Sequence, residues 1–373
     1  MGSLSALFVG GTGTISSACV ARALSQGIDV TMLNRGLRSR AGTEARAGAG
    51  TEAGAGAGTG AGAEAGADAR LAYGAAQAVG GARGKLKSLV CDINDEQAAS
   101  RLLDGERFDA VADFVAFTRE QVERDIRLFE GRARQYLFIS SASVYKKPST
   151  QCKLTECTAL ANPFWQYARD KIECELTLNE AFRRDGFPAT IVRPSHTYGD
   201  HGVPVGIHGA NGSWQVLARI LCGKPVLVHG DGTSWWTFTH ADDFAAGFVG
   251  LIGNPSAKGE AVHITSDEYL SWNEAYHVIG NALGREPVLA HVASEAIARR
   301  DHSLEGPLLG DKANPLVFDN TKIKRLVPGF YARVRFDQGV RRAVAHMMAH
   351  PEQKRPDPSF DGFCDEMIAA YCH

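Results

Sequence analysis

The chain has 373 residues, enough to bury a large core and to form one big or two moderate domains. Its 40 basic and 42 acidic residues nearly balance, which argues against a general attraction to nucleic acid or to anionic membranes. It has eight cysteines but no Cys-x-x-Cys pair, no secretory signal, and no apolar run of about 18 residues. These features predict a cytoplasmic protein with reduced thiols and no membrane span.

The first residues predict a strand, a glycine turn and a helix. Residues 4–9 are an apolar run suited to a buried parallel strand, residues 10–13 read Gly-Gly-Thr-Gly, and residues 15–24 predict a helix. Glycines at such a turn let the backbone approach a pyrophosphate, whose charge the helix N-terminus favours. Ser16 replaces the third glycine of the usual fingerprint, so an ordinary tight turn is the alternative interpretation.

The second predicted strand, residues 28–33, ends in Asn34-Arg35. An Asp or Glu at this place would bond a ribose 2′-hydroxyl, whereas Arg35, with Arg38 and Arg40 nearby, could hold a 2′-phosphate. The pattern therefore favours NADP over NAD, with a basic surface turn as the alternative.

Residues 41–84 are dominated by Ala, Gly, Glu and Thr and offer almost no large apolar side chain. This composition predicts a flexible insertion between the second and third strands. We expect no catalytic role for it.

The alternation of strands and helices continues after the insertion. Strands are predicted over residues 86–91, 108–117 and 136–139, and a helix over 118–130 that opens with a capping box. This order predicts an α/β fold with a Rossmann-type, doubly wound parallel sheet. Ligands of such sheets bind beyond the carboxyl ends of the strands, where the following residues fall: Gly10, Asn34, Asp92, Phe114 and Ser141.

Tyr167 and Lys171 are the candidate catalytic pair. Asn162-Pro163 predicts the start of a helix that stops at Gly186, and on this helix the pair lies one turn apart on one face. A neighbouring ammonium favours the phenolate and so lowers the pKa of a tyrosine. A Tyr-x-x-x-Lys pair can also be a solvated helix face. The glycine turn and the serine-rich strand end at residues 140–143 favour a hydride-transfer site, because all three parts occur in order.

The chain resembles the extended short-chain dehydrogenase/reductase family, also called the NAD-dependent epimerase/dehydratase family. The resemblance rests on Val9-Gly-Gly-Thr-Gly-Thr-Ile15, Asp92-Ile93, Ile139-Ser-Ser-Ala-Ser-Val-Tyr145, Tyr167-x-x-x-Lys171, Ile191-Val-Arg-Pro-Ser-His-Thr-Tyr-Gly199 and Phe238-Thr-His-Ala-Asp-Asp-Phe-Ala245.

The resemblance implies roles for individual residues. Tyr167 would be the acid/base, Lys171 would bond the nicotinamide ribose and lower the pKa of the tyrosine, and Ser141 would bond the reacting oxygen, with Ser143 in reserve. The cofactor would contact Gly10, Thr12, Gly13, Thr14, Ile15, Asn34, Arg35, Asp92, Ile93, Phe114, Tyr167, Lys171 and Pro194. A homodimer through the helices at 118–130 and 163–184 is implied by analogy.

Departures from the family pattern narrow the chemistry. The Asp-Glu pair of 4,6-dehydratases is replaced by Ala142-Ser143, which makes dehydration an unlikely reaction. His196 and Trp236 stand where nucleotide-sugar enzymes tend to carry Asn and a diphosphate-binding Arg. The substrate is therefore expected to be sugar-like without being a nucleotide diphosphate sugar.

Residues 196–236 are expected to set substrate specificity, since they offer aromatic faces and neutral donors suited to a polyol ring. The candidates for substrate binding are Ser143, His196, Trp214 and Trp236. Three histidines also suggest a metal, but their spacing matches no standard motif, so none is expected.

The expected organisation is a Rossmann domain over residues 1–192, a substrate lobe over 193–345 interleaved with returning core strands at about 236–265, and a tail over 346–373 with a surface helix. The predicted function is an NAD(P)-dependent epimerase or reductase that transfers hydride at a secondary alcohol or ketone carbon of a sugar-like substrate. The alternative is a non-catalytic dinucleotide-binding or RNA-binding protein of the same fold. Intact Ser141, Tyr167 and Lys171 and the near-neutral charge argue against it.

Overall fold

A parallel sheet forms the centre of the molecule. The computed structural model describes residues 3–35, 83–151 and 153–372. The seven strands are β1 (Ser5–Val9), β2 (Asp29–Asn34), β3 (Leu86–Val90), β4 (Ala110–Asp113), β5 (Tyr136–Ile139), β6 (Ala189–Pro194) and β11 (Ala261–Ile264). They are arranged β11-β6-β5-β4-β1-β2-β3, and every neighbouring pair is parallel. The predicted doubly wound α/β fold is confirmed.

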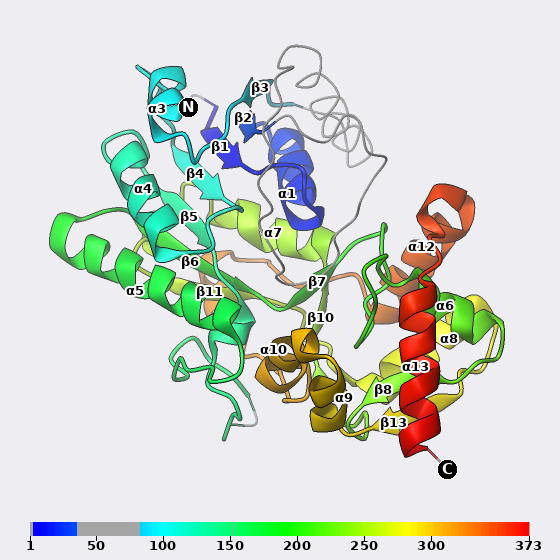
Figure 1. Cartoon of the computed structure of the whole chain (residues 1–373). Helices are drawn as coiled ribbons and strands as arrows, with labels where there is room; N and C mark the ends of the chain where they lie inside the picture. Colours follow the sequence, from blue (N-terminus) through cyan, green and yellow to red (C-terminus); the bar gives the residue numbers. More distant parts are fainter. Residues whose placement is uncertain (1–2, 36–82, 152, 373) are drawn as a thin grey trace.

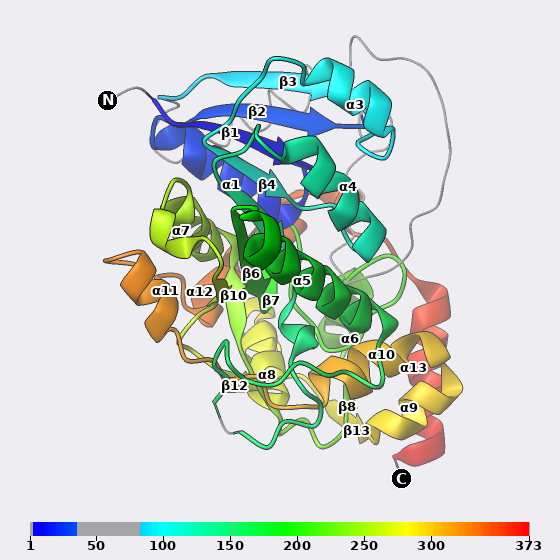
Figure 2. The ribbon, with the colours of Figure 1, turned by 90° about the vertical axis from the view of Figure 1, so that its left-hand side faces the viewer.

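Helices cover both faces of this sheet, as Figures 1 and 2 show. One face packs against α1 (Thr14–Ser25), α7 (Ala241–Leu251) and α11 (Thr321–Leu326). The other packs against α3 (Glu96–Leu102), α4 (Arg119–Phe129) and α5 (Gln166–Asp185). Strand β5 is buried at every residue, so its run Tyr136–Ile139 is apolar throughout and shows no alternation. The edge strand β3 is less buried and exposes Lys87.

A second lobe lies at the carboxyl edge of the sheet. It contains β7 (His196–Tyr198), α6 (Trp214–Leu221), β8 (Val226–His229), β9 (Trp235–Trp236), β10 (Phe238–His240), β12 (Leu270–Ser271), α8 (Trp272–Leu283), β13 (Leu289–Val292), α9 (Ser294–Arg300), α12 (Phe336–Ala349) and α13 (Pro358–Tyr371). Its apolar core joins α6, α8, α12 and α13. The chain returns from this lobe to the sheet at β11, so the two parts are interleaved. Helix α12 crosses the boundary expected at residue 345.

Two predicted boundaries were wrong for local reasons. Helix α5 begins at Gln166 and not at Pro163, because the Asn162 Oδ1 accepts hydrogen bonds from the backbone N–H groups of Phe164 (3.2 Å) and Trp165 (3.1 Å) and holds them in a turn. Strand β4 ends at Asp113 rather than residue 117. There the Asp113 Oδ1 accepts from the N–H groups of the second and third residues after it, at 2.6 and 2.7 Å, which turns the chain out of the sheet.

Most of the insertion predicted at residues 41–84 lies outside the described residues. Where the description resumes, the N–H groups of Arg83 and Gly84 donate to the Leu24 carbonyl at the end of α1. Within the described part of the chain, no helix is long and apolar enough to cross a bilayer. The seven cysteines that are described are free thiols.

Candidate active site

The glycine turn between β1 and α1 is shaped for close approach of a ligand. Gly10 has φ +81°, and a Cβ placed on it would lie 2.3 Å from the Cγ1 of Val115. The Gly11 N–H donates to the Asn34 Oδ1 at 3.0 Å, and the Gly13 N–H donates to the Ser16 Oγ at 2.8 Å. Ser16, the departure from the usual fingerprint, therefore closes the turn from within the first helical turn. The bare backbone beside the N-terminus of α1 fits a dinucleotide pyrophosphate.

The remaining cofactor candidates lie along the same edge of the sheet. Thr12, Thr14 and Ile15 are partly buried in the turn, Asn34 and exposed Arg35 end β2, and buried Pro194 ends β6. Asp92 is exposed beyond β3, while Ile93 is buried. Arg38 and Arg40 lie outside the described residues, so Arg35 is the described part of the predicted basic cluster.

The ring of Phe114 packs against other aromatic rings of the sheet's core. Its ring stacks on Phe8 with centroids 6.0 Å apart and packs 5.4 Å from Phe248. The ring thus packs against the core, and the Cβ of Phe114 lies 3.7 Å from a Cβ placed on Gly10.

Lys171 is buried and fixed by the ends of two strands. Its Nζ donates to the carbonyls of Ala116 and Ile139, both at 2.7 Å, and lies 4.5 Å from the ring centre of Phe117 and 4.6 Å from that of Phe138. Burial lowers the pKa of Lys171 to about 8. Its position at the ends of β4 and β5 follows from α5 packing on that face of the sheet.

Tyr167 lies one turn before Lys171, with its ring centre 5.9 Å from the lysine Nζ. Burial raises the pKa of Tyr167 to about 12, a hydrogen bond with Ser141 opposes this, and the charge of Asp311 adds to it. Because burial dominates, the tyrosine is protonated at neutral pH. A lowering of its pKa by Lys171 stays a prediction.

Ser141 connects the tyrosine with the loop after β5. Its Oγ lies 2.9 Å from the Ser143 Oγ and accepts from the Ser143 N–H at 3.1 Å. Ser141, Ser143 and Tyr167 are therefore brought together, as their order along the chain suggested.

Three charged residues that the sequence did not predict as site residues lie near this loop: Lys147, Asp311 and Lys312. Lys147 follows the loop after β5, and Asp311 and Lys312 end the π-helical turn η4 (Leu308–Lys312). The Lys147 Nζ lies 4.0 Å from the Asp311 Oδ1, and the Lys312 Nζ donates to the Gly206 carbonyl at 2.8 Å. Burial raises the pKa of Asp311 to about 6 and lowers those of both lysines to about 8. Irregular helical turns of this kind are frequent at functional sites, but no sequence spacing marks them.

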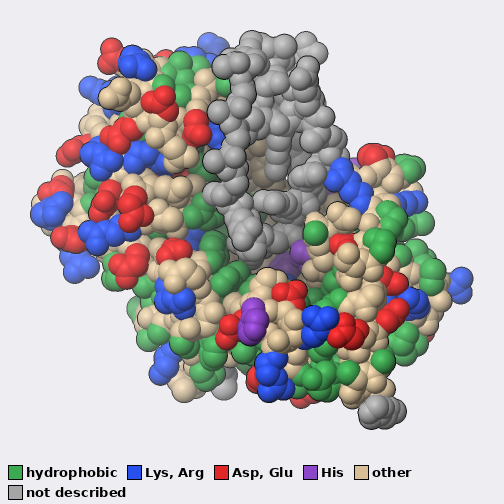
Figure 3. Space-filling view, viewed as in Figure 1, with side chains coloured by type: hydrophobic (Ala, Val, Ile, Leu, Met, Phe, Trp, Pro, Cys, Tyr) green, Lys and Arg blue, Asp and Glu red, His purple; other side chains and the backbone are tan. Residues whose placement is uncertain are grey.

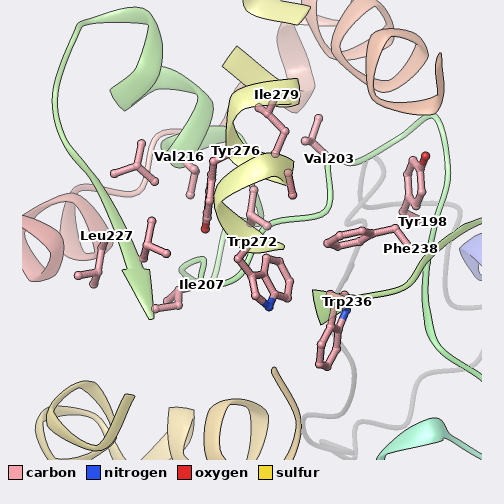
Figure 4. Packing of buried hydrophobic residues seen from close by; sticks show 14 of the residues in the cluster. Tyr198, Val203, Ile207, Val216, Leu227, Trp236, Phe238, Trp272, Tyr276 and Ile279 are labelled. Carbon is pink, nitrogen blue, oxygen red and sulfur yellow. The ribbon is translucent and has the colours of Figure 1, made fainter. Parts of the chain in front are cut away.

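Trp236, Phe238 and Trp272 pack together in the buried core of the second lobe (Figure 4). The rings of Trp236 and His196 lie 5.4 and 6.4 Å from the ring of Trp272. Burial lowers the pKa of His196 to about 3, with Lys312 and His208 adding to the effect. His196 is therefore neutral at pH 7 and can donate or accept a hydrogen bond.

Trp214, the other predicted substrate residue, lies at the start of α6. Its ring packs against the core of the second lobe, and the Nζ of Lys354 lies 5.7 Å from its ring centre.

His240 and Asp243 have hydrogen-bond partners in the backbone. The His240 Nδ1 accepts from the Asp242 N–H, and the Asp243 carboxylate accepts from the N–H groups of Arg333 and Val334.

Buried Lys171 gives a prediction about pH. Its pKa of about 8 in the fold lies below its ordinary value of 10.5, so the unfolded chain binds more protons between these pH values. Wild type should gain stability relative to Lys171→Met as pH rises from 8 to 10, by roughly 2 kcal/mol. Urea unfolding at each pH measures this. For the control Lys146→Met, at an exposed lysine, the difference in unfolding free energy from wild type should not change with pH. A gap between wild type and Lys171→Met that does not change with pH contradicts the prediction.

Comparisons with known proteins agree with this geometry. Residues 6–265 match the model of the NAD dependent epimerase/dehydratase family. The chain is 29% identical over 249 residues to a 2'-dehydrokanamycin reductase of Streptomyces kanamyceticus, which covers 66% of this chain and 69% of that protein. It is 27% identical over 208 residues to the chloroplast stem-loop binding protein of 41 kDa b of Arabidopsis thaliana, covering 56% and 51%.

A similar fold occurs in the UDP-glucose 4-epimerase of Bifidobacterium longum, whose structure holds NAD+ and UDP. It superposes with a TM-score of 0.68 at 17% identity, over 94% of this chain and 99% of that one.

Proposed function

Because this chain belongs to the NAD dependent epimerase/dehydratase family, we propose that it is a nicotinamide-dinucleotide-dependent reductase of a ketone on a sugar-like substrate. A bound nicotinamide dinucleotide would supply the hydride to the carbonyl carbon. The observation that supports this direction is the protonated Tyr167 beside Ser141, with Lys171 behind it. A protonated Tyr167 can donate its proton to a carbonyl oxygen directly. Oxidation of an alcohol would first require Tyr167 to lose that proton, so that the phenolate can act as the base.

In the proposed reduction, Ser141, Tyr167 and Lys171 have separate roles. The Ser141 hydroxyl bonds the substrate carbonyl oxygen and orients it toward Tyr167. The Tyr167 hydroxyl donates its proton to that oxygen, which becomes the alcohol, and the phenolate left behind takes a proton from solvent. The Lys171 ammonium, which has three donors, uses two on the carbonyls of Ala116 and Ile139. We assign the third to the nicotinamide ribose.

Two features support a substrate other than a nucleotide sugar. Trp236 occupies the place where an arginine would bind a diphosphate, and its indole is buried against Trp272 in the core of the second lobe. The 2'-dehydrokanamycin reductase among the relatives acts, by its name, on a ketone of an aminoglycoside. Dehydration is not proposed, because Ala142 and Ser143 bring no carboxylate to the loop after Ser141.

The end of β2 favours NADPH as the cofactor. It carries no carboxylate for a ribose 2′-hydroxyl, the Asn34 Oδ1 is occupied by the Gly11 N–H, and Arg35 is exposed and available to a 2′-phosphate. We expect tighter binding of NADPH than of NADH by about tenfold or more, and Arg35→Ala should abolish most of that preference.

Isothermal titration with each cofactor, followed by a panel of keto-sugars and aminocyclitol ketones, tests the cofactor and the reaction together. Arg107→Ala, at an exposed arginine near the amino end of β4, is the matched control and should leave both affinities unchanged. Equal affinity for the two cofactors would overturn the NADP preference, and release of tightly held NAD from the purified protein would favour an epimerase cycle.

The similarity to the chloroplast stem-loop binding protein favours a second candidate, RNA binding without catalysis. The protein has a net charge of −2, and basic and acidic side chains are interspersed on the face seen in Figure 3. Nucleic-acid binding draws on clustered Lys and Arg, so the charge does not support this candidate. A salt-sensitive shift of RNA in a gel, with no cofactor bound, would favour it over the reductase.

A further inference from the structure

The charged atoms of Lys147 and Asp311 lie close together inside the protein, and the proposed proton transfer uses neither of them. The Lys147 side chain is 0% exposed and that of Asp311 is 14% exposed. Their charged atoms are 4.0 Å apart, beyond hydrogen-bonding distance. Among the described residues, the Lys147 Nζ and the Asp311 Oδ1 both lack a hydrogen-bond partner. Buried charges left in this state destabilise a fold, so their retention points to a ligand.

The separation of the two groups is fixed by the segment that presents Tyr167. The Asn162 Nδ2 donates to the carbonyls of Ser143 (2.8 Å) and Gly310 (2.7 Å) and so joins the loop after β5 to the turn that contains Asp311. Gly310 packs so closely that an added Cβ would lie 2.9 Å from the Cβ of Trp165. Lys147 and Asp311 are therefore prearranged beside the start of α5, where Tyr167 lies.

The chemistry of the gap selects one kind of ligand group. An ammonium supplies donors and a carboxylate supplies acceptors, so the group between them must both accept and donate. A hydroxyl does both, and an oxygen about 2.8 Å from each charged atom fits a separation of 4.0 Å. A carboxylate or phosphate placed there would meet the charge of Asp311, and an ammonium would meet Lys147. A neutral hydroxyl is repelled by neither Lys147 nor Asp311.

We propose that Lys147 and Asp311 bind a hydroxyl of the substrate, on a ring carbon close to the one reduced. This inference rests on the proposed function and narrows its substrate class to polyhydroxylated rings that keep a free hydroxyl near the carbonyl. Sites that bind a hydroxyl through buried polar groups reject analogues that lack it, because those groups are then left unpaired. The pair thus determines specificity, whereas Tyr167 does the chemistry.

The first test needs no substrate. In the double variant Lys147→Met/Asp311→Asn both charges are removed at nearly constant volume. If the pair serves a ligand, the free protein should be at least as stable as wild type in urea unfolding, because an unsatisfied ion pair has been replaced by neutral groups. Lys146→Met, at the exposed neighbouring lysine, is the control for loss of a positive charge. A double variant whose urea midpoint lies more than about 0.5 M below that of wild type would show a structural ion pair and overturn the proposal.

The second test measures recognition with defined probes. Methyl hexopyranosides and their monodeoxy analogues are compared by saturation-transfer NMR with wild type, Lys146→Met and the double variant. Wild type and Lys146→Met should prefer the parent over one particular deoxy analogue by about tenfold, and the double variant by less than about twofold. Unchanged discrimination in the double variant, or no binding of any hexopyranoside to wild type at tens of millimolar, would equally overturn the proposal.

These outcomes separate the inference from the proposed function. Binding of a dinucleotide and loss of reduction in Tyr167→Phe concern the reductase alone. Unfolding and probe discrimination concern Lys147 and Asp311 alone, since neither readout uses hydride transfer.

Discussion

Replacing Tyr167 by Phe should lower kcat by about 10³-fold or more while leaving the affinity for the dinucleotide within about twofold of wild type. The change removes one oxygen from a residue whose ring lies 4.9 Å from that of Trp165, so the packing is kept. The hydroxyl is the group we assign to proton donation, and no other described side chain is placed beside both Ser141 and Lys171 in the same way.

Steady-state kinetics on the ketone identified by the substrate panel, with cofactor titration in parallel, measures this. Tyr269→Phe, at a tyrosine that is 46% exposed, is the matched control and should retain full activity. A Tyr167→Phe enzyme that keeps most of its kcat would remove the tyrosine from the mechanism. A loss of cofactor affinity and folding together would instead indicate a structural role.

Gly10→Ala should abolish dinucleotide binding and destabilise the fold by roughly 3 kcal/mol. Two effects add: the residue has φ +81°, a conformation unfavourable for alanine, and the new Cβ would lie 2.3 Å from the Val115 Cγ1. Any relief of that contact moves the turn that approaches the pyrophosphate, so binding is affected as well as stability.

Gly131→Ala separates these two effects. Gly131 has φ +66° with nothing within 4 Å of an added Cβ, so the variant keeps the backbone strain and omits the steric contact. We expect a loss of about 1 kcal/mol in urea unfolding and unchanged cofactor binding. Equal losses of stability in the two variants would show that the close approach at Gly10 contributes nothing.

The parts of the site that depend on local pattern were predictable. The glycine turn, the strand ends and the Tyr167–Lys171 pair are each set by a few neighbouring residues, because a strand–turn–helix unit and an i, i+4 spacing fix geometry within one segment. The parallel sheet was predictable for a similar reason, since buried strands are continuous apolar runs. The end of β4 and the start of α5 were not predictable, because side-chain oxygens of Asp113 and Asn162 hold turns that apolar periodicity does not show.

The amino-acid sequence by itself determined the α/β class, the family and the positions of the dinucleotide turn and the Tyr–Lys pair. The tertiary structure decided what surrounds that pair. Lys147 and Asp311 are 164 positions apart along the chain and come within 4.0 Å because Asn162 binds the carbonyls of both supporting segments. The contacts of Trp214, with the core of the second lobe and with Lys354, also come from the tertiary structure. Burial, which depends on the packing of both lobes, also raises the pKa of Tyr167, whereas its spacing from Lys171 predicted a lowered pKa.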